Sequence, residues 1–269
     1  MQSRQIQDED RTVTTSMHRL WRWPRLIAHR GGGTLAPENT LAAFRLGHAH
    51  GYRMMEYDVK LSQDNVPILL HDDTIRRTSN GKGSASKLRI ADLLKYDFGS
   101  WHSAAYAGEP IPALHAISAY TIANGLHSNI EIKPGAGTDT ETGHRVACAA
   151  QHLWNGAELP PLLSSFSERA LVAAQNTAPE LPRALLIEGP VPGDWQARVD
   201  RLECIGLNLD HNHVSESLVR DIIAAGYTLA VWTVNDPARA RQLLQWGCHA
   251  IVTDMIATIN PADYSDLDE

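Results

Sequence analysis

Two apolar runs of the sequence end in carboxylates of the kind that binds metal ions. Glu56 and Asp58 close one run, and Glu131 lies near the end of another. Glu56 and Asp58 are two positions apart, so on a β-strand their side chains face the same way. Carboxylate oxygens suit Mg²⁺, Ca²⁺ or Mn²⁺, and a cluster of like charges is costly without such a cation. The pattern predicts one divalent ion, with Mg²⁺ favoured, at Glu56, Asp58 and Glu131.

Two histidines and two basic residues accompany these carboxylates. His29 ends an earlier apolar run, and His71 follows the run at residues 66–70. Displacement at a phosphodiester needs one group to take a proton from the nucleophile and another to protonate the departing alkoxide, and imidazole suits both tasks. We therefore predict His29 and His71 as the catalytic pair. Arg30 and Lys133 would bind the substrate, because they add positive charge around phosphoryl oxygens.

The elements that must position these residues alternate between β-prone runs and stretches of helical period, a pattern typical of repeated βα units. Strands are predicted at residues 25–29, 53–58, 128–133, 161–165, 183–187, 204–209, 227–233 and 249–253. Helices are predicted at residues 39–50, 113–124, 142–154, 168–176, 194–201, 215–225 and 236–245, with Asn39 as a candidate N-cap of the first. Eight such units predict an α/β fold, a (β/α)8 TIM barrel, whose active site lies at the C-terminal ends of the strands.

One further β-prone run, at residues 66–70, follows the second predicted strand too closely for a parallel return. We predict an antiparallel hairpin with a two-residue turn at residues 64–65, in which Asp58 pairs with His71. Residues 72–112 are then a small insertion after the second strand, expected to cover the barrel mouth. This register brings His71 back beside the carboxylate of Asp58.

Composition and charge restrict the class of protein. Hydrophobic residues make up 43% of the 269 residues and charged residues 20%, which is typical of soluble globular proteins. The net charge of −7 argues against a nucleic-acid partner, which would need a basic surface. No apolar run is long enough for membrane insertion, and Cys148, Cys204 and Cys248 form no disulfide or metal-ligand pattern. We expect a cytoplasmic protein.

Three segments are expected along the chain. Residues 1–22 read as a polar, disordered leader without the apolar region of a secretory signal, and Met17 could be the natural start. Residues 23–262 are expected to form the barrel domain, including the insertion at 72–112. Residues 263–269 form an acidic tail.

These motifs resemble those of the glycerophosphodiester phosphodiesterase family. The segments that carry the resemblance are AHRGGG at 28–33, APENT at 36–40, Glu56-x-Asp58, LHDD at 70–73, RTxNG at 77–81, EIKP at 131–134, LSSF at 163–166, WTVN at 232–235 and TD at 253–254. The sequence is especially similar to the cytoplasmic bacterial members associated with glycerol-phosphate uptake. The resemblance extends from about residue 23 to residue 253.

The resemblance implies a TIM barrel of the phospholipase C-like phosphodiesterase type that hydrolyses a small-molecule glycerophosphodiester to sn-glycerol 3-phosphate and an alcohol. It implies acid–base roles for His29 and His71, with the three carboxylates as metal ligands. By similarity to related barrel enzymes, the glycerol 2-hydroxyl attacks first and water then opens a cyclic phosphate. We expect His29 as the first base and His71 as the first acid, although the sequence leaves this direction open, together with the alcohol, the metal and the oligomeric state.

Other interpretations remain at this point. Glu56 or Asp58 could form structural ion pairs, and Trp232, which ends the seventh predicted strand, could pack on a substrate or only fill the barrel. A related enzyme acting on intact phospholipids would need an apolar rim, whereas the aromatic residues of the insertion are interspersed with charge and glycine. A non-catalytic phosphate-binding protein would not need both histidines. The catalytic interpretation is favoured because ionisable residues from separate strands meet at one end of the sheet.

Overall fold

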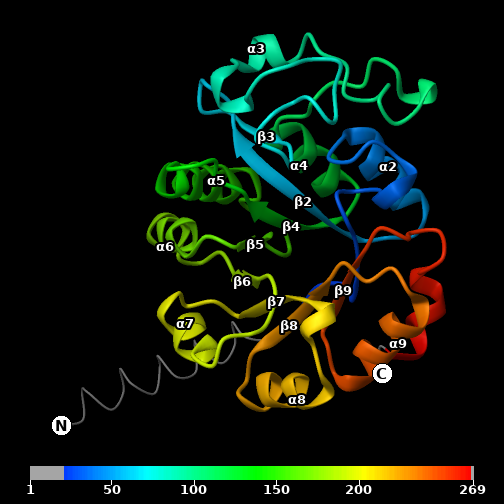
Figure 1. The fold of residues 1–269 in the computed structure, drawn as a ribbon, viewed down its shortest axis with the longest axis vertical. Coiled ribbons are helices and arrows are strands. Elements are labelled where there is room, and N and C mark those ends of the chain that lie inside the picture. The colour runs from blue at the N-terminus through cyan, green and yellow to red at the C-terminus, as the bar shows by residue number, and fades with distance from the viewer. Residues whose placement is uncertain (1–20, 268–269) are drawn as a thin grey trace.

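Eight parallel strands close into a barrel in the computed structural model, which describes residues 21–267 (Figure 1). β1 pairs with both β9 and β2, so the sheet has no gap between its first and last parallel strands. The predicted (β/α)8 TIM barrel is confirmed. The strands are β1 (Leu26–Ala28), β2 (Met54–Leu61), β4 (His127–Ile132), β5 (Leu162–Ser165), β6 (Arg183–Ile187), β7 (Gly206–Asp210), β8 (Thr228–Trp232) and β9 (Ala250–Thr253).

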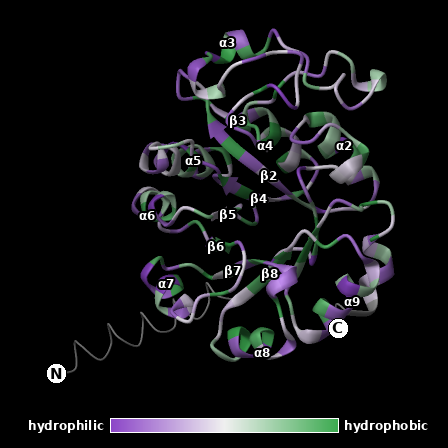
Figure 2. Ribbon diagram, viewed as in Figure 1, coloured by the Kyte–Doolittle hydropathy of each residue, from purple (hydrophilic) through white to green (hydrophobic). Residues whose placement is uncertain are grey.

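Helices cover the outside of the barrel between successive strands (Figure 1). They are α2 (Leu41–Ala49), α4 (Leu114–Ala123), α5 (Asp139–Leu153), α6 (Glu168–Thr177), α7 (Trp195–Arg201), α8 (Glu216–Ala224) and α9 (Pro237–Trp246). Each corresponds to a predicted helix, and α5 begins at Asp139 rather than at residue 142. The strands are largely hydrophobic, while helices such as α7 and α9 include hydrophilic residues (Figure 2). This pattern is expected where helices pack one face on a buried sheet.

The barrel interior changes character along its axis. Near the N-terminal ends of the strands it is filled by apolar side chains, including Ile27 and Met54, with Trp23 packed against them. Alternation along β2 then puts Glu56 and Asp58 on the same side of the strand as Met54. The C-terminal end of the barrel is therefore the polar end, as expected for an active site in this fold.

The hairpin after β2 forms with a register that differs by one residue from the predicted one. β3 (Pro67–Leu69) runs antiparallel to β2, with Val59 opposite Leu69, and the Leu70 N–H donates to the Asp58 carbonyl at 3.1 Å. The two-residue turn was wrong, because Asn65 adopts a left-handed φ of 59° and lengthens the turn. Leu70 rather than His71 is thus opposite Asp58, and His71 is the next residue along the chain.

The insertion after β3 has a small hydrophobic core of its own. The core is formed by Ile68, Leu70, Ile75, Ala85, Leu93, Phe98 and Ile111. The segment contains η2 (Ala85–Lys87), α3 (Ile90–Leu93) and η3 (Ala104–Tyr106), and it lies at the top of Figure 1. It packs on the segment between β1 and α2, where His102 Nε2 lies 3.0 Å from the Thr34 carbonyl oxygen, and on the start of α2, where Glu109 accepts the Ala42 N–H at 3.0 Å. The insertion is thereby attached to the loop that carries the residues after His29.

Both ends of the described chain are packed on the barrel. Trp21 makes an edge-to-face contact with Trp23 at the N-terminal end of the barrel, so the packed region includes a residue of the segment expected as a leader. The rest of the predicted leader, residues 1–20, lies outside the described residues. Tyr264 is buried within η5 (Pro261–Leu267), so the first part of the expected acidic tail is a packed element. Within residues 21–267, none of the helices has the length and hydrophobicity needed to cross a membrane.

Candidate active site

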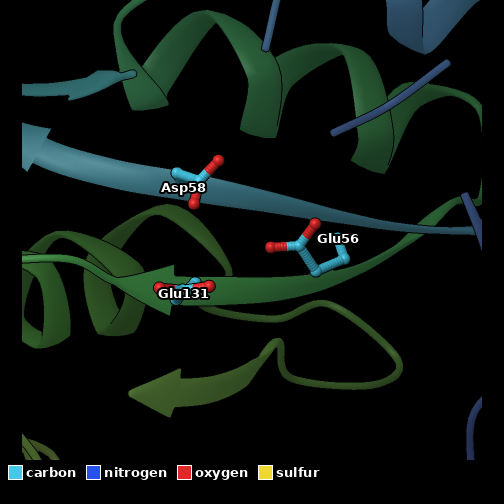
Figure 3. Close-up of side chains that lie close together, drawn as sticks. All are labelled: Glu56, Asp58 and Glu131. Carbon is cyan, nitrogen blue, oxygen red and sulfur yellow. The ribbon is translucent and has the colours of Figure 1, made fainter. Parts of the chain in front are cut away.

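Three buried carboxylates converge at the C-terminal end of the barrel (Figure 3). Glu56 and Asp58 come from β2 and Glu131 from the neighbouring strand β4, where it is the register partner of Asp58. One oxygen from each carboxylate lies within 4.8 Å of the others. The strand pairing and the two-residue alternation are therefore sufficient to bring together the three residues predicted as metal ligands.

The pKa values of these carboxyl groups show the cost of this arrangement. Burial, reinforced by the charge of Asp58, raises the pKa of Glu131 to about 8. Burial likewise raises the pKa of Glu56, although His29 opposes the shift. For Asp58, burial also acts upward, but Lys133 and Arg30 outweigh it and the net pKa is lowered. The cluster thus has one firmly ionised carboxylate and two that burial makes hard to ionise.

Such a donor set fits a divalent cation. Three carboxylate oxygens at mutual metal-ligand spacing form a hard, anionic site, and a cation between them would favour ionisation of Glu56 and Glu131. In their present arrangement, the Lys133 ammonium lies 3.1 Å from Asp58 Oδ1 and 3.1 Å from Glu131 Oε1. Lys133 therefore supplies positive charge at the position where the sequence predicted it.

His29 is held between two carboxylates at the end of β1. Its backbone N–H donates to the Thr253 carbonyl, and its Nδ1 lies 2.6 Å from Asp254 Oδ1. Its Nε2 lies 3.7 Å from Glu56 Oε2. Burial acts to lower the pKa of His29, but the hydrogen bond with Asp254 and the charge of Glu56 outweigh it, so the net pKa is raised.

His71 reaches the site from the hairpin arm. Its Nδ1 lies 2.8 Å from Asp72 Oδ1, and its side chain is 32% exposed, compared with 19% for His29. In spite of the shifted register, His71 is only one residue beyond Leu70, whose N–H bonds to the Asp58 carbonyl. Burial lowers the pKa of His71 and exceeds the opposing effect of Asp58.

Arg30 links the end of β1 to the carboxylate cluster. It adopts a left-handed φ of 50°, an uncommon conformation for a residue with a side chain, and its backbone N–H donates to Glu56 Oε2 at 3.2 Å. Its guanidinium lies 3.3 Å from Asp58 Oδ2 and donates to Glu38 Oε1 at 2.9 Å. The side chain is therefore directed at the site where the sequence placed a phosphate-binding cation.

Asn39 does not cap α2 as expected from the sequence. Thr40 is the N-cap, because its side chain accepts the Ala43 N–H. Asn39 instead adopts a φ of 58° and points its amide at Asp58, donating to Oδ2 at 2.8 Å and accepting the Asp58 N–H at 3.1 Å. This buried amide fixes the orientation of a candidate metal ligand. Hydrogen bonds of this kind, from residues that do not bind the metal themselves, commonly tune metal sites.

Trp232 lies at the C-terminal end of β8, at the edge of the barrel interior. It packs partly on the apolar cluster inside the barrel and meets the ring of Phe166 edge to face, with centroids 5.6 Å apart. Phe166 is 41% exposed. The position of Trp232 is thus compatible with both predicted roles. It fills part of the barrel interior, and together with Phe166 it presents an apolar edge on which a substrate could pack.

Several residues in contact with the site were not predicted as site residues from the sequence. They are Glu38, Asn39, Asp72, Arg77, Phe166 and Asp254. Asp72 and Asp254 each orient a histidine, and the signal for Asp72 was its position directly after His71. Asp254 follows β9 and is 225 positions from its partner, so no local spacing indicates the contact.

Comparison with known proteins identifies the family. The sequence model of the Glycerophosphoryl diester phosphodiesterase family matches residues 29–258. YhdW of Bacillus subtilis, provisionally named a glycerophosphodiester phosphodiesterase, is 31% identical over 234 residues, covering 85% of this chain and 93% of that protein. A glycerophosphodiester phosphodiesterase of Caldanaerobacter subterraneus is 29% identical over 229 residues, 85% of this chain and 93% of its own length.

A solved structure agrees with this result. A phosphodiesterase from Oleispira antarctica, determined in complex with the product sn-glycerol-3-phosphate, superposes with a TM-score of 0.84 at 36% sequence identity. The match covers 90% of this chain and 98% of the other. The alternative of a binding protein without catalytic activity is not supported, because these relatives are enzymes. The chain belongs to the glycerophosphodiester phosphodiesterase family and is an enzyme of that family.

Proposed function

We propose that this enzyme hydrolyses glycerophosphodiesters to sn-glycerol 3-phosphate and an alcohol, using a divalent cation, Mg²⁺ by preference, and two histidines. One observation carries the proposal: two histidines lie next to the carboxylate cluster. His29 Nε2 is 3.7 Å from Glu56 Oε2, and His71 directly follows Leu70, whose N–H bonds to the Asp58 carbonyl. Each histidine has its Nδ1 on a separate carboxylate, so each Nε2 is left for proton transfer.

The reaction would proceed in two displacements at phosphorus. In the first, one histidine takes the proton of the glycerol 2-hydroxyl, the resulting oxygen attacks phosphorus, and the bond to the alcohol breaks as the other histidine protonates the leaving oxygen. In the second, water replaces the hydroxyl, the histidines exchange proton roles, and opening of the cyclic phosphate gives sn-glycerol 3-phosphate. A cation held by Glu56, Asp58 and Glu131 would polarise a phosphoryl oxygen.

The order of the proton roles depends on the cation. The sequence-based expectation makes His29 the first base and His71 the first acid. Without metal, the raised pKa of His29 and the lowered pKa of His71 favour the reverse order. The expected order requires a bound cation to offset the effect of Glu56, since positive charge disfavours an imidazolium nearby.

The remaining residues of the site would bind the substrate. Arg30 and Lys133 supply positive charge for the phosphoryl oxygens, and Trp232 with Phe166 offers an apolar edge to the carbon skeleton. The Oleispira antarctica relative was solved with sn-glycerol-3-phosphate, which supports a small phosphorylated glycerol as the product here.

A coupled assay for released glycerol 3-phosphate tests the reaction and the metal requirement together. We expect release from glycerophosphocholine or glycerophosphoethanolamine that EDTA abolishes and added Mg²⁺ restores. Full activity after exhaustive chelation would contradict the metal role. Absence of glycerol 3-phosphate, with another product formed instead, would contradict the proposed bond cleavage.

Replacement of Glu56 by Gln tests the carboxylate cluster directly. Loss of one anionic ligand should raise the Mg²⁺ concentration needed for half-maximal activity by about 10-fold or more. The matched control is Glu216→Gln, which removes an exposed carboxylate on α8 that pairs with Arg220. An unchanged Mg²⁺ requirement in Glu56→Gln would count against this residue as a ligand.

A further inference from the structure

Arg77, in the insertion, connects two carboxylates that belong to different parts of the molecule. Its Nε and Nη2 lie 2.9 and 3.0 Å from the two oxygens of Asp72. Its Nη1 and Nη2 lie 2.7 and 2.8 Å from the two oxygens of Glu38, which belongs to the segment between β1 and α2. The planar guanidinium thus makes two bidentate contacts, a geometry that a lysine cannot reproduce.

Asp72 transmits this contact to His71. One of its oxygens accepts from Arg77 and also lies 2.8 Å from His71 Nδ1. Hydrogen bonds lower the pKa of Asp72 to about 2, those with Arg77 most strongly and the one with His71 in addition. Asp72 therefore stays ionised near neutral pH. An ionised carboxylate accepts the proton on Nδ1, and the unprotonated Nε2 of neutral His71 is then free for the substrate.

Glu38 continues the chain of contacts to the metal-binding cluster. It accepts from Arg30 at 2.9 Å as well as from Arg77, and Arg30 lies 3.3 Å from Asp58. The sequence of groups from His71 to Asp58 is therefore Asp72, Arg77, Glu38 and Arg30, with carboxylates and guanidinium groups alternating. Glu38 is only 13% exposed although Arg77 is 44% exposed, so the chain is anchored at its inner end.

His71 needs such support because the strand before it is short. β3 has three residues, pairs with the end of β2 and makes one further bridge from Ile68 to Ala113, and His71 lies beyond it. His29, by comparison, has its backbone N–H bonded to the neighbouring strand β9. The contacts of Asp72 therefore replace, for His71, the support that the barrel gives to His29.

We propose that Arg77 is a positioning residue for His71, holding Asp72 in place and tying it through Glu38 and Arg30 to the opposite side of the site. The inference rests on the proposed acid–base role of His71. Arg77 itself does not touch the reacting atoms. Its removal should impair proton transfer by His71 while leaving the binding of metal and substrate largely intact.

The test begins with Arg77→Ala and Arg77→Lys. Arg77→Ala should lower kcat for glycerophosphocholine by about 10-fold, with KM and the Mg²⁺ midpoint changed by less than about 3-fold. Arg77→Lys should fall between Arg77→Ala and the unmodified enzyme, because it keeps the charge and loses the bidentate contacts. The control is Arg145→Ala on α5, where an arginine of similar exposure pairs with Glu141 and kcat should not change.

A double-mutant cycle with His71→Ala separates positioning from a general structural role. If Arg77 acts through His71, Arg77→Ala should change kcat by less than about 2-fold in the His71→Ala background, measured at enzyme concentrations high enough to give a clear rate. An equal effect in both backgrounds would overturn the inference, as would an unchanged kcat in Arg77→Ala alone. If Arg77→Ala does not fold, the same cycle is run with Arg77→Lys and judged by the same comparison.

Failure of the proposed function would look different. Normal turnover in His71→Ala, which retains Arg77, would refute the acid–base role of His71 itself. Loss of turnover in His71→Ala combined with an additive effect of Arg77→Ala would leave that role standing and refute only the positioning role of Arg77.

Discussion

The two histidines of the site are held by different kinds of structure. His29 ends a barrel strand, bonds through its backbone to β9, and has its Nδ1 on Asp254 at 2.6 Å. His71 follows a three-residue strand and has its Nδ1 on Asp72 at 2.8 Å, within a partly exposed network of side chains. One position is built into the barrel and the other is added by the insertion, yet both use the same carboxylate–imidazole contact.

The surroundings also shift the pKa values of the two histidines in opposite directions. For both side chains burial lowers the pKa, but Asp254 and Glu56 overcome it at His29, whereas nothing overcomes it at His71. In the metal-free enzyme, His29 therefore stays protonated to higher pH than His71. A pair with separated pKa values provides one acid and one base, which is what a displacement at phosphorus requires.

Asp254→Asn should have the largest effect among changes to the partners of the histidines. The amide cannot stabilise a charged imidazole as the carboxylate does, and it can present its NH₂ group to Nδ1 and favour the wrong tautomer, so we expect kcat to fall on the order of 10²-fold. The coupled release of glycerol 3-phosphate measures it. Asp221→Asn on the exposed face of α8 is the matched control. A fall of less than about 3-fold would show that Asp254 does not orient His29 for catalysis.

Asp72→Asn should have a smaller effect, a fall in kcat of about 10-fold, because its histidine is more exposed and solvent competes with the contact. The same assay ranks the two variants. Asp92→Asn, an exposed carboxylate of α3 in the same insertion, controls for a general disturbance of that segment. A larger loss in Asp72→Asn than in Asp254→Asn would reverse the comparison between the two positions.

The smallest expected effect is a difference in how pH changes stability. The raised pKa of His29 gives stability that is present below its unfolded pKa and is lost as pH rises through the folded pKa. The lowered pKa of His71 acts in the opposite sense, because stability is lost as pH falls below the unfolded pKa. Relative to the unmodified protein, His29→Gln should thus lose more stability at low pH than at high pH. His71→Gln should lose less stability at low pH than at high pH.

Urea unfolding in EDTA at about pH 5.5 and about pH 8 measures these slopes, and we expect opposite signs for the two variants. EDTA is needed because a bound cation would change both pKa values. Slopes of the same sign for the two variants would show that the surroundings do not separate the histidines.

The barrel could be predicted from the sequence because its strands and helices have local signatures. β6 was expected at residues 183–187 and is observed as Arg183–Ile187, and the two-residue spacing of Glu56 and Asp58 correctly placed both carboxylates on one face of β2. The hairpin register was not predictable from the turn residues alone, since Asn65 takes a left-handed conformation that allows a longer turn.

The contacts that organise the site were harder to predict. Asn39 was interpreted from its local role as a helix cap, while the structure uses its amide to hold Asp58. Glu38 and Arg77 are 39 positions apart and approach only because the insertion packs on the segment after β1. Contacts between side chains of distant segments have no periodicity in the sequence, so they emerge only once the fold is known.

We expect His29 and His71 to carry the proton transfers at a site whose metal ligands are other residues. The most direct measurement is kcat for glycerol 3-phosphate release in His29→Ala and His71→Ala, together with the affinity for Mn²⁺ measured by direct titration. We predict that each variant loses roughly 10²-fold or more in kcat while its Mn²⁺ affinity stays within about 3-fold. Near-normal kcat in either variant, or a loss of Mn²⁺ affinity that accounts for the loss of turnover, would contradict the account.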